Sequence, residues 1–197
     1  SEAKSHQLTL LPRDHQKSAM LAYRVAWEIT RNPAVRVLYI SATTKLAVKQ
    51  LSFIKNILTS DIYRHYWPDM VNESLNDRTK WTETEISVDH HKRRKENIRD
   101  ATVDTAGLTT VITGLHFDII CIDDVVIDDN AKTREGREEV KERISYLASI
   151  AGTDSHIWVV GTRYHPDDLY SFFLEANYHT LDEEGGLSET MYLYEIF

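Results

Sequence analysis

The chain has 197 residues, of which 42% are hydrophobic, and this length suits one medium-sized domain rather than two full ones. Its formal net charge of -8 makes the surface as a whole repel phosphate, so contact with nucleic acid requires a local basic patch. The single cysteine, Cys121, excludes a disulfide framework and fits a reducing compartment, and no run approaches the roughly 18 apolar residues of a membrane-spanning helix.

In chain order, short apolar strands alternate with amphipathic helices, which is typical of a parallel α/β fold. The predicted strands cover residues 7–11, 35–41, 117–122 and 157–160. The predicted helices cover residues 17–31, 44–58 and 133–150, and a fourth begins at Pro166, because proline is favoured at the first helical position. The less regular segment 61–113 contains weaker strand signals at 85–88 and 101–105. Residues 191–197 are predicted either to start a strand or to lead into a further domain.

The turn between the first strand and the first helix is the first candidate site. A turn of this kind points unpaired backbone N–H groups and the positive end of the helix dipole at an anion. Lys17 then reaches the outer phosphates of a nucleotide, and Ser18 ligates Mg²⁺. Because Leu11 and Gln16 stand where the usual pattern G-x-x-x-x-G-K-[ST] has glycine, an ordinary surface helix start remains the alternative.

The second candidate site is a buried strand that ends in Asp123 and Asp124. Ligands of open α/β sheets bind at the carboxyl ends of the strands. Asp123 is predicted to hold Mg²⁺ together with Ser18, and Asp124 to orient or deprotonate the attacking water in phosphoryl transfer. Simple solvation of the strand end is the alternative. The later pair, Asp128 and Asp129, is predicted to lie in a solvated loop or to cap a helix.

The third candidate site follows the last predicted strand, whose end is expected beside the end of the Asp123 strand. Thr162 is predicted to sense the γ-phosphate, and Arg163 to contact phosphate or to pair with a carboxylate. Asp167 and Asp168 are predicted to fall in the first turn of the next helix, where negative charge is favourable.

Taken together, these three segments resemble the ATPase domain of tailed-bacteriophage terminase large subunits, and the resemblance covers nearly the whole chain. Residues 12–18 have the degenerate form of the phosphate loop often seen in that family. Residues 113–124 are similar to its acidic strand motif, and residues 161–169 are similar to its coupling motif, the most specific of the three. Residues 40–43 also match the helicase-like second strand.

The resemblance implies an α/β P-loop NTPase fold of the additional-strand (ASCE) type, with a mostly parallel central sheet flanked by helices. It implies hydrolysis of Mg-ATP that drives double-stranded DNA into the procapsid, in the cytoplasm of the infected bacterial host. The implied partners are the portal protein, the terminase small subunit and further copies of the chain in a ring. The implied nucleotide-binding residues are Pro12, Arg13, Asp14, His15, Gln16, Lys17 and Ser18. The implied catalytic residues are Arg13, Lys17, Asp124 and Thr162.

The resemblance also implies a division of the chain and an incomplete set of catalytic groups. Residues 1–180 are expected to form the motor domain without the preceding segment that grips adenine. Residues 181–197 are expected to be a linker or the approach to a C-terminal nuclease domain outside this chain. Leu115 and His116 stand where some relatives carry arginine, so the arginine that a neighbouring subunit supplies is unassigned, with Arg99 as the candidate.

Three other functions remain open from the sequence. The first is another helicase-like P-loop ATPase, and the second is an ATP-binding assembly module that hardly hydrolyses its ligand. The third is a two-metal nuclease that uses Asp118, Asp123, Asp124 and Asp167. The basic run 91–95 is predicted to contact DNA phosphates or a neighbouring subunit, with a solvated loop as the alternative. The nine histidines show no metal-ligand spacing, so no zinc site is expected.

Overall fold

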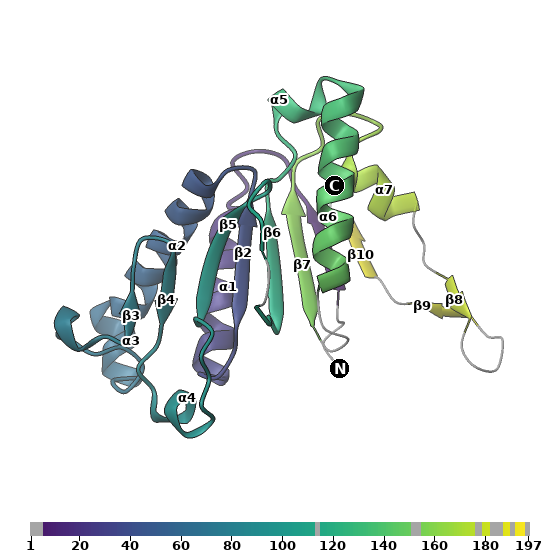
Figure 1. Ribbon diagram of the computed structural model, residues 1–197. Coiled ribbons are helices and arrows are strands. Elements are labelled where there is room, and N and C mark those ends of the chain that lie inside the picture. Colours follow the sequence, from purple (N-terminus) through teal and green to yellow (C-terminus); the bar gives the residue numbers. More distant parts are fainter. Residues whose placement is uncertain are drawn as a thin grey trace.

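The computed structural model describes residues 6–112, 115–150, 155–175, 179–181, 187–189 and 192–195. Its centre is one eight-stranded sheet (Figure 1). In spatial order the strands are β10 (Tyr192–Glu195), β1 (His6–Leu10), β7 (His156–Gly161), β6 (Ile119–Asp123), β2 (Val37–Ser41), β5 (Val103–Gly107), β4 (Glu85–Ser87) and β3 (Lys80–Trp81). Strands β10 to β5 run parallel, and β4 and β3 form an antiparallel edge. The predicted α/β class with a mostly parallel sheet is confirmed.

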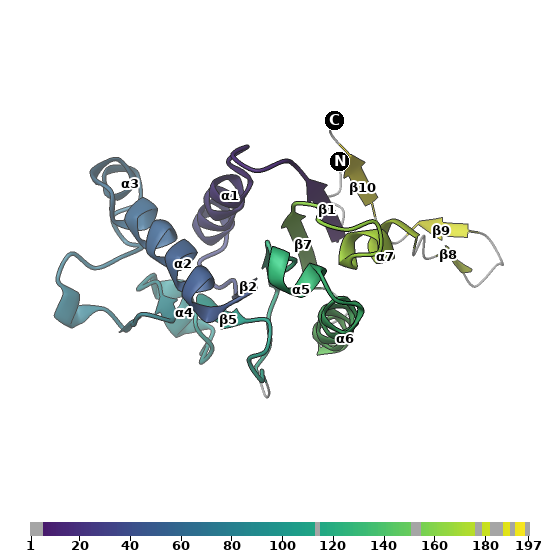
Figure 2. The same cartoon turned by 90° about the horizontal axis from the view of Figure 1, so that it is seen from above.

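Helices cover both faces of this sheet. Helices α1 (Lys17–Arg31) and α2 (Thr44–Thr59) lie on one face, while α6 (Arg134–Ile150) and α7 (Leu169–Glu175) lie on the other (Figure 2). Every residue of the central strand β2 is buried, because its side chains alternate between two cores. Val37 and Tyr39 pack toward α1 and α2, and Leu38 and Ile40 pack toward α6 and α7.

Shorter elements fill the connections. Helix α3 (Asp61–Tyr66) and a single 3-10 turn (Leu75–Asp77) follow α2, and α4 (His91–Lys95) precedes β5. Helix α5 (Asp128–Ala131) lies between β6 and α6, and a hairpin of β8 (His179–Leu181) and β9 (Leu187–Glu189) follows α7. None of the helices in the described part of the chain is long and apolar enough to cross a membrane.

The fourth predicted helix begins later than the sequence indicates, and its start at Pro166 is wrong. Pro166 lies in a turn, and α7 begins at Leu169. The reason is Asp168, whose carboxylate accepts hydrogen bonds from the backbone N–H groups of Tyr170 (3.0 Å) and Ser171 (3.2 Å). An acceptor in this place satisfies the free donors of a first helical turn. Asp167 and Asp168 therefore precede the first turn rather than belonging to it.

The two interpretations of the C-terminal residues are also resolved in part. Residues Tyr192–Glu195 form β10, which pairs in parallel with β1 at the edge of the main sheet. These four residues thus continue the sheet of the main fold. The division of the chain near residue 180 stays a prediction. Residues 113–114, at the start of the acidic strand motif, lie outside the described residues.

Candidate functional site: the carboxyl edge of the sheet

The predicted phosphate loop connects β1 to α1 at the carboxyl edge of the parallel strands. Its backbone is left-handed at Asp14 (φ 66°) and at Gln16 (φ 58°), although neither residue is glycine. Gln16 occupies the second glycine position of the usual pattern, so the loop keeps the backbone conformation without the residue that adopts it most easily. His15 contacts the Arg13 carbonyl through Nδ1 (2.8 Å), which helps to hold the turn. Residues Pro12 to Gln16 are exposed, and the N-terminus of α1 follows them directly at Lys17.

Lys17 and Ser18, the first residues of α1, contact the two carboxylates at the end of β6. Lys17 is only 7% exposed, and its Nζ lies 3.1 Å from Oδ2 of Asp124. The Ser18 hydroxyl donates to Oδ1 of Asp123 at 2.8 Å. The first two candidate sites, more than 100 residues apart in sequence, are therefore one cluster.

Tyr39 of β2 is a further member of this cluster that the sequence analysis missed. Its hydroxyl donates to Oδ2 of Asp123 at 2.9 Å, so both oxygens of this carboxylate accept a hydrogen bond. Tyr39 lies opposite Cys121 in the strand register, two residues before Asp123, and side chains two apart share one face of a sheet. The available signal was a tyrosine within the predicted strand 35–41, and its meaning depends on the pairing of β2 with β6.

Burial raises the pKa of the Asp123 carboxyl to about 6, against the smaller effects of the bonds from Ser18 and Tyr39. A buried carboxylate that is costly to ionise gains from a cation placed beside it. A serine hydroxyl and a carboxylate are oxygen ligands of the kind that Mg²⁺ takes when it also binds phosphates. The residues present therefore fit a magnesium ion at Ser18 and Asp123.

Asp124 is held in an unusual position directly after β6. Its backbone is left-handed (φ 45°), and its N–H donates to the Val160 carbonyl at the end of β7 (3.0 Å). One carboxylate oxygen faces Lys17, while the other, Oδ1, is buried without a hydrogen-bond partner in the described part of the structure. A buried acceptor without a partner is unfavourable, and a water or a ligand group would satisfy it.

Strand β7 brings the third candidate site to the same place, because it lies between β1 and β6. The Thr162 hydroxyl donates to the Leu11 carbonyl at 3.1 Å, and the Leu11 N–H donates to the Gly161 carbonyl at 3.1 Å. Arg13 donates to the hydroxyl of Tyr164 and lies over its ring, with 5.3 Å between the guanidinium carbon and the ring centroid. The segment after β7 thus contacts the phosphate loop on one side, through Thr162 and Tyr164.

Arg163 forms no ion pair with a carboxylate of the described residues, and its predicted contact with phosphate stays a prediction. Its guanidinium donates to the Pro166 carbonyl (3.2 Å) and to the Ser171 hydroxyl, and so it links the turn before α7 to the first turn of that helix. The prediction of a carboxylate partner is therefore not met.

Tyr170 of α7 is a second residue that the sequence analysis missed. It is completely buried, burial raises its pKa well above the usual value, and Asp124 is the second cause of the increase. Among the described residues, its hydroxyl has no hydrogen-bond partner at a standard distance and angle, although the backbone of Val126 lies close to it. The ring lies over Gly161, where a Cβ atom would be 1.9 Å from the tyrosine oxygen. Only glycine fits at this point of β7.

Several predicted residues have partners outside the cluster or lie at the other edge of the sheet. Arg99 lies between α4 and β5, at the amino edge of the parallel strands, so within one chain it does not approach Lys17. Asp118, just before β6, pairs with Arg36 (2.6 Å), and Asp167 pairs with Lys141 (2.8 Å).

Of the four carboxylates of the nuclease alternative, Asp123 and Asp124 lie together, whereas Asp118 and Asp167 form ion pairs with residues outside the cluster. Within the described ranges, no group of three or more His, Cys, Asp or Glu side chains is placed to hold a metal ion. Asp128 and Asp129 occupy the first turn of α5, whose N-cap residue is Ile127, so neither is the helix cap that was one of the two predictions for this pair.

The class of protein follows from this arrangement. A loop with lysine and serine leads from β1 into α1, the acidic strand β6 lies beside the helix N-terminus, and a further strand, β7, is inserted between β1 and β6. This is the P-loop NTPase fold of the additional-strand type.

Comparison with known proteins narrows this class. No protein-family model matches the sequence. Over 124 residues the chain is 31% identical to the terminase large subunit of Enterobacteria phage T3, and the alignment covers 63% of this chain and 20% of the T3 protein. The chain is therefore similar to part of a phage terminase large subunit, in line with the resemblance of its motifs.

Two solved structures resemble the fold. A variant of the large terminase ATPase domain of Thermus phage P74-26 has a TM-score of 0.50 and 15% identity, covering 95% of this chain and 69% of that one. The N-terminal domain of the DNA packaging ATPase from bacteriophage phi29 has a TM-score of 0.49 and 8% identity, covering 87% and 80%. The first of these supports the assigned fold class.

Proposed function

We propose that this chain is the ATPase motor domain of a phage terminase large subunit, which hydrolyses Mg-ATP to drive double-stranded DNA into the procapsid. The observation that carries the proposal is the cluster at the carboxyl edge of the sheet. There, Lys17 and Ser18 of the phosphate loop contact Asp124 and Asp123 of the acidic strand directly. The relation to the phage T3 terminase large subunit supports the biological setting.

The phosphate loop binds the nucleotide. The N-terminus of α1 and the ammonium group of Lys17 attract the outer phosphates, and Arg13 adds a second cation at the exposed side of the loop. Ser18 and Asp123 would hold Mg²⁺, which would supply positive charge to the phosphate oxygens when bound. Because the phosphates compete for Lys17, its ion pair with Asp124 loosens when ATP enters.

Asp124 then acts on water. A carboxylate released from Lys17 orients the attacking water and accepts its proton, with the buried oxygen Oδ1 as the acceptor that has no other partner. The Asp124 N–H remains bonded to Val160, so the carboxylate keeps its place relative to β7. Thr162 senses the γ-phosphate and passes its presence to the segment before α7, because its hydroxyl is bonded to the loop at Leu11.

The partners in this proposal are those of a packaging motor. They are double-stranded DNA, the portal protein of the procapsid, the terminase small subunit and further copies of the chain in a ring, all in the cytoplasm of the infected host. Arg99 is proposed as the arginine supplied to the site of a neighbouring copy, where such a group is worth about 10³ to 10⁵ in turnover. Nuclease activity is proposed to belong to a separate C-terminal domain.

The test is Mg²⁺-dependent phosphate release from ATP, measured over a range of protein concentrations. Lys17→Ala and Asp124→Asn are expected to lower turnover at least about a hundredfold, since each removes a group that acts on the transferred phosphate or its nucleophile. Lys49→Ala is the matched control, because Lys49 is exposed on α2 and touches neither the loop nor β6. Absence of both ATP binding and phosphate release in the unmodified chain would contradict the proposal, and so would equal turnover in all four proteins.

A further inference from the structure

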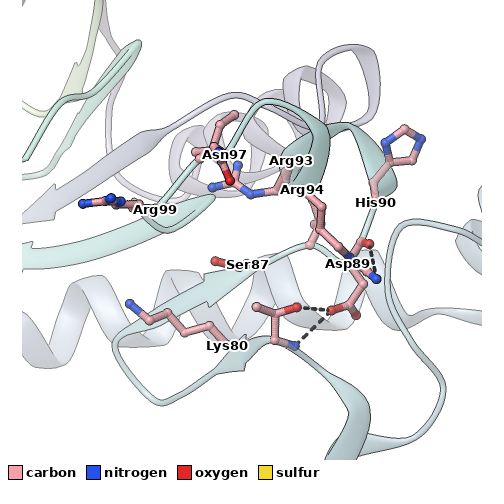
Figure 3. Close-up of a pocket in the computed structure, with 11 residues that line it drawn as sticks. Lys80, Ser87, Asp89, His90, Arg93, Arg94, Asn97 and Arg99 are labelled. Carbon is pink, nitrogen blue, oxygen red and sulfur yellow. Dashed lines mark hydrogen bonds between the residues drawn. The ribbon is translucent and has the colours of Figure 1, made fainter.

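A basic cavity lies at the amino edge of the parallel strands. The nucleotide cluster, formed by Lys17, Ser18, Asp123 and Asp124, lies at the carboxyl edge. The cavity has a volume of about 500 Å³ and is lined by residues of β3, β4, α4 and the segment up to residue 99 (Figure 3). Its lining carries four cationic side chains against one carboxylate, that of Asp89. The cations are Lys80, Arg93, Arg94 and Arg99. This excess of positive charge is local, because the whole chain carries a formal charge of -8.

Two of these cations keep their charge available to a ligand. Arg94 and Arg99 are exposed, and within the described ranges neither forms an ion pair with a carboxylate. Arg94 makes one long hydrogen bond (3.3 Å), to the backbone carbonyl of Asp89. The Asp89 carboxylate itself is already bonded to the N–H and hydroxyl of Thr79 and to the N–H of Asn72. The Asp89 carboxylate therefore stabilises the loop that contains Asn72 and Thr79, and it does not neutralise Arg94 or Arg99.

Arg93 holds in place the segment of the cavity lining that carries Arg94 and Arg99. The Arg93 side chain is buried and donates to the backbone carbonyls of Pro33 (3.1 Å), Val35 (3.0 Å) and Asp100. It thereby ties α4 to the segments before β2 and β5. Charge-assisted hydrogen bonds of this kind are among the stronger ones in proteins. Arg94 and Arg99 consequently project from a fixed surface, which reduces the entropy lost when they bind a ligand.

The geometry points to a site for the phosphodiester backbone of double-stranded DNA at this cavity, and we propose that Arg94 and Arg99 contact its phosphates. Two exposed guanidinium groups on a fixed wall suit repeated phosphates, because each group donates up to five hydrogen bonds in a planar fork. The proposal deepens the proposed function by naming the surface that contacts the DNA, and it rests on that function for the identity of the nucleic acid.

The position of the cavity makes the two roles separable. Strand β5 begins at Val103, close to the cavity, and ends at Gly107, beside the start of α2 at the nucleotide edge. Five residues of extended chain span about 15 Å. Substitutions at Arg94 or Arg99 therefore leave the contacts among Lys17, Ser18 and Asp123 unchanged.

The test compares binding of a short labelled duplex DNA by the unmodified chain and by Arg94→Gln/Arg99→Gln, over salt concentrations from about 50 to 200 mM. The glutamine variant is expected to bind about tenfold more weakly, with a slope of log affinity against log salt smaller by about 0.9 for each lost phosphate contact. Arg94→Lys/Arg99→Lys should retain most of the affinity, because it keeps both charges. Arg143→Gln removes one arginine charge on α6, beside Glu139 and Glu142, and should leave binding unchanged.

Phosphate release from ATP is measured on the unmodified chain and on Arg94→Gln alone, because Arg99 is also the arginine proposed for the site of a neighbouring copy. A failure of this inference is then distinct from a failure of the proposed function. Normal DNA affinity and salt slope in the glutamine variant would overturn the inference while leaving the ATPase proposal intact. Failure of the unmodified chain to bind DNA at low salt would also overturn it. Displacement of the duplex by an equal concentration of inorganic phosphate would assign the cavity to a single phosphate group and overturn the backbone site.

Discussion

Gly161→Ala is expected to destabilise the protein through one contact with Tyr170. The added Cβ would lie 1.9 Å from the tyrosine oxygen and 2.2 Å from Cζ, whereas real Cβ atoms essentially never approach within 3.0 Å. The ring must therefore move by about 1 Å or more, yet Tyr170 is completely buried and close-packed surroundings resist such a shift. Overpacking of this kind costs about 1–3 kcal/mol.

An opposing effect is smaller. Alanine lowers the conformational entropy of the unfolded chain relative to glycine, which favours the folded state by about 0.4–1 kcal/mol. The net loss in the free energy of unfolding is therefore about 1 kcal/mol, and about 2.5 kcal/mol at most. Urea denaturation should show a lower midpoint with an unchanged slope, because the surface exposed on unfolding stays nearly the same.

The partner residue supplies the control for this prediction. Tyr170→Leu removes the ring atoms that the new Cβ would meet, at its own cost of a few kcal/mol for a smaller buried side chain. Gly161→Ala should cost at least about 1 kcal/mol less in the Tyr170→Leu background than in the unmodified chain, which a double-mutant cycle measures. An equal cost in both backgrounds would refute the steric argument, as would an unchanged midpoint for Gly161→Ala alone.

Three further predictions concern the nucleotide cluster. Gln16→Gly should raise the free energy of unfolding by about 0.5–1 kcal/mol and Gln16→Val should lower it, since φ is 58° at this position; a denaturation series that ranks valine with glycine would contradict this. Tyr39→Phe should lower the free energy of unfolding by about 2 kcal/mol at neutral pH, because it removes a donor to the buried Asp123 carboxylate, and an unchanged urea midpoint would argue against that bond. Because burial raises the pKa of Asp123 from 3.8 to about 6, the unfolded chain releases this proton first as pH rises. Without metal, the free energy of unfolding should therefore fall by up to about 3 kcal/mol between roughly pH 4 and 6, and Asp123→Asn should lack this part of the pH profile.

Much of the fold could be predicted from the sequence because the signals are local. The apolar run before Asp123 indicates a strand buried on both faces, and the Lys17–Ser18 pair at a strand-to-helix turn indicates an anion site. The predicted meeting of these residues at one sheet edge is found, because parallel strands place their carboxyl ends together. The class of fold and four members of the cluster, Lys17, Ser18, Asp123 and Asp124, could therefore be predicted from the sequence.

The parts that could not be predicted depend on contacts between distant segments. Tyr39 reaches Asp123 only because β2 pairs with β6 in a particular register. Tyr170 reaches Gly161 because α7 packs back on β7, and the start of α7 depends on which acidic residue captures the free backbone donors. Pro166 is compatible with a helix start, but Asp168 provides the cap, and a sequence alone does not rank these two signals.

The parallel pairing of β6 with both β2 and β7 has a mechanical consequence. Hydrogen bonds join β6 to both neighbours along its length, from Ile119 to Asp123. A force directed along β6 loads these bonds together in shear, rather than breaking them one after another as peeling would. A pull applied at the amino edge, where the basic cavity lies, would therefore reach the carboxyl edge with little extension of the strand. In the proposed function, the sheet would therefore be a stiff link between the proposed DNA surface and the proposed nucleotide site.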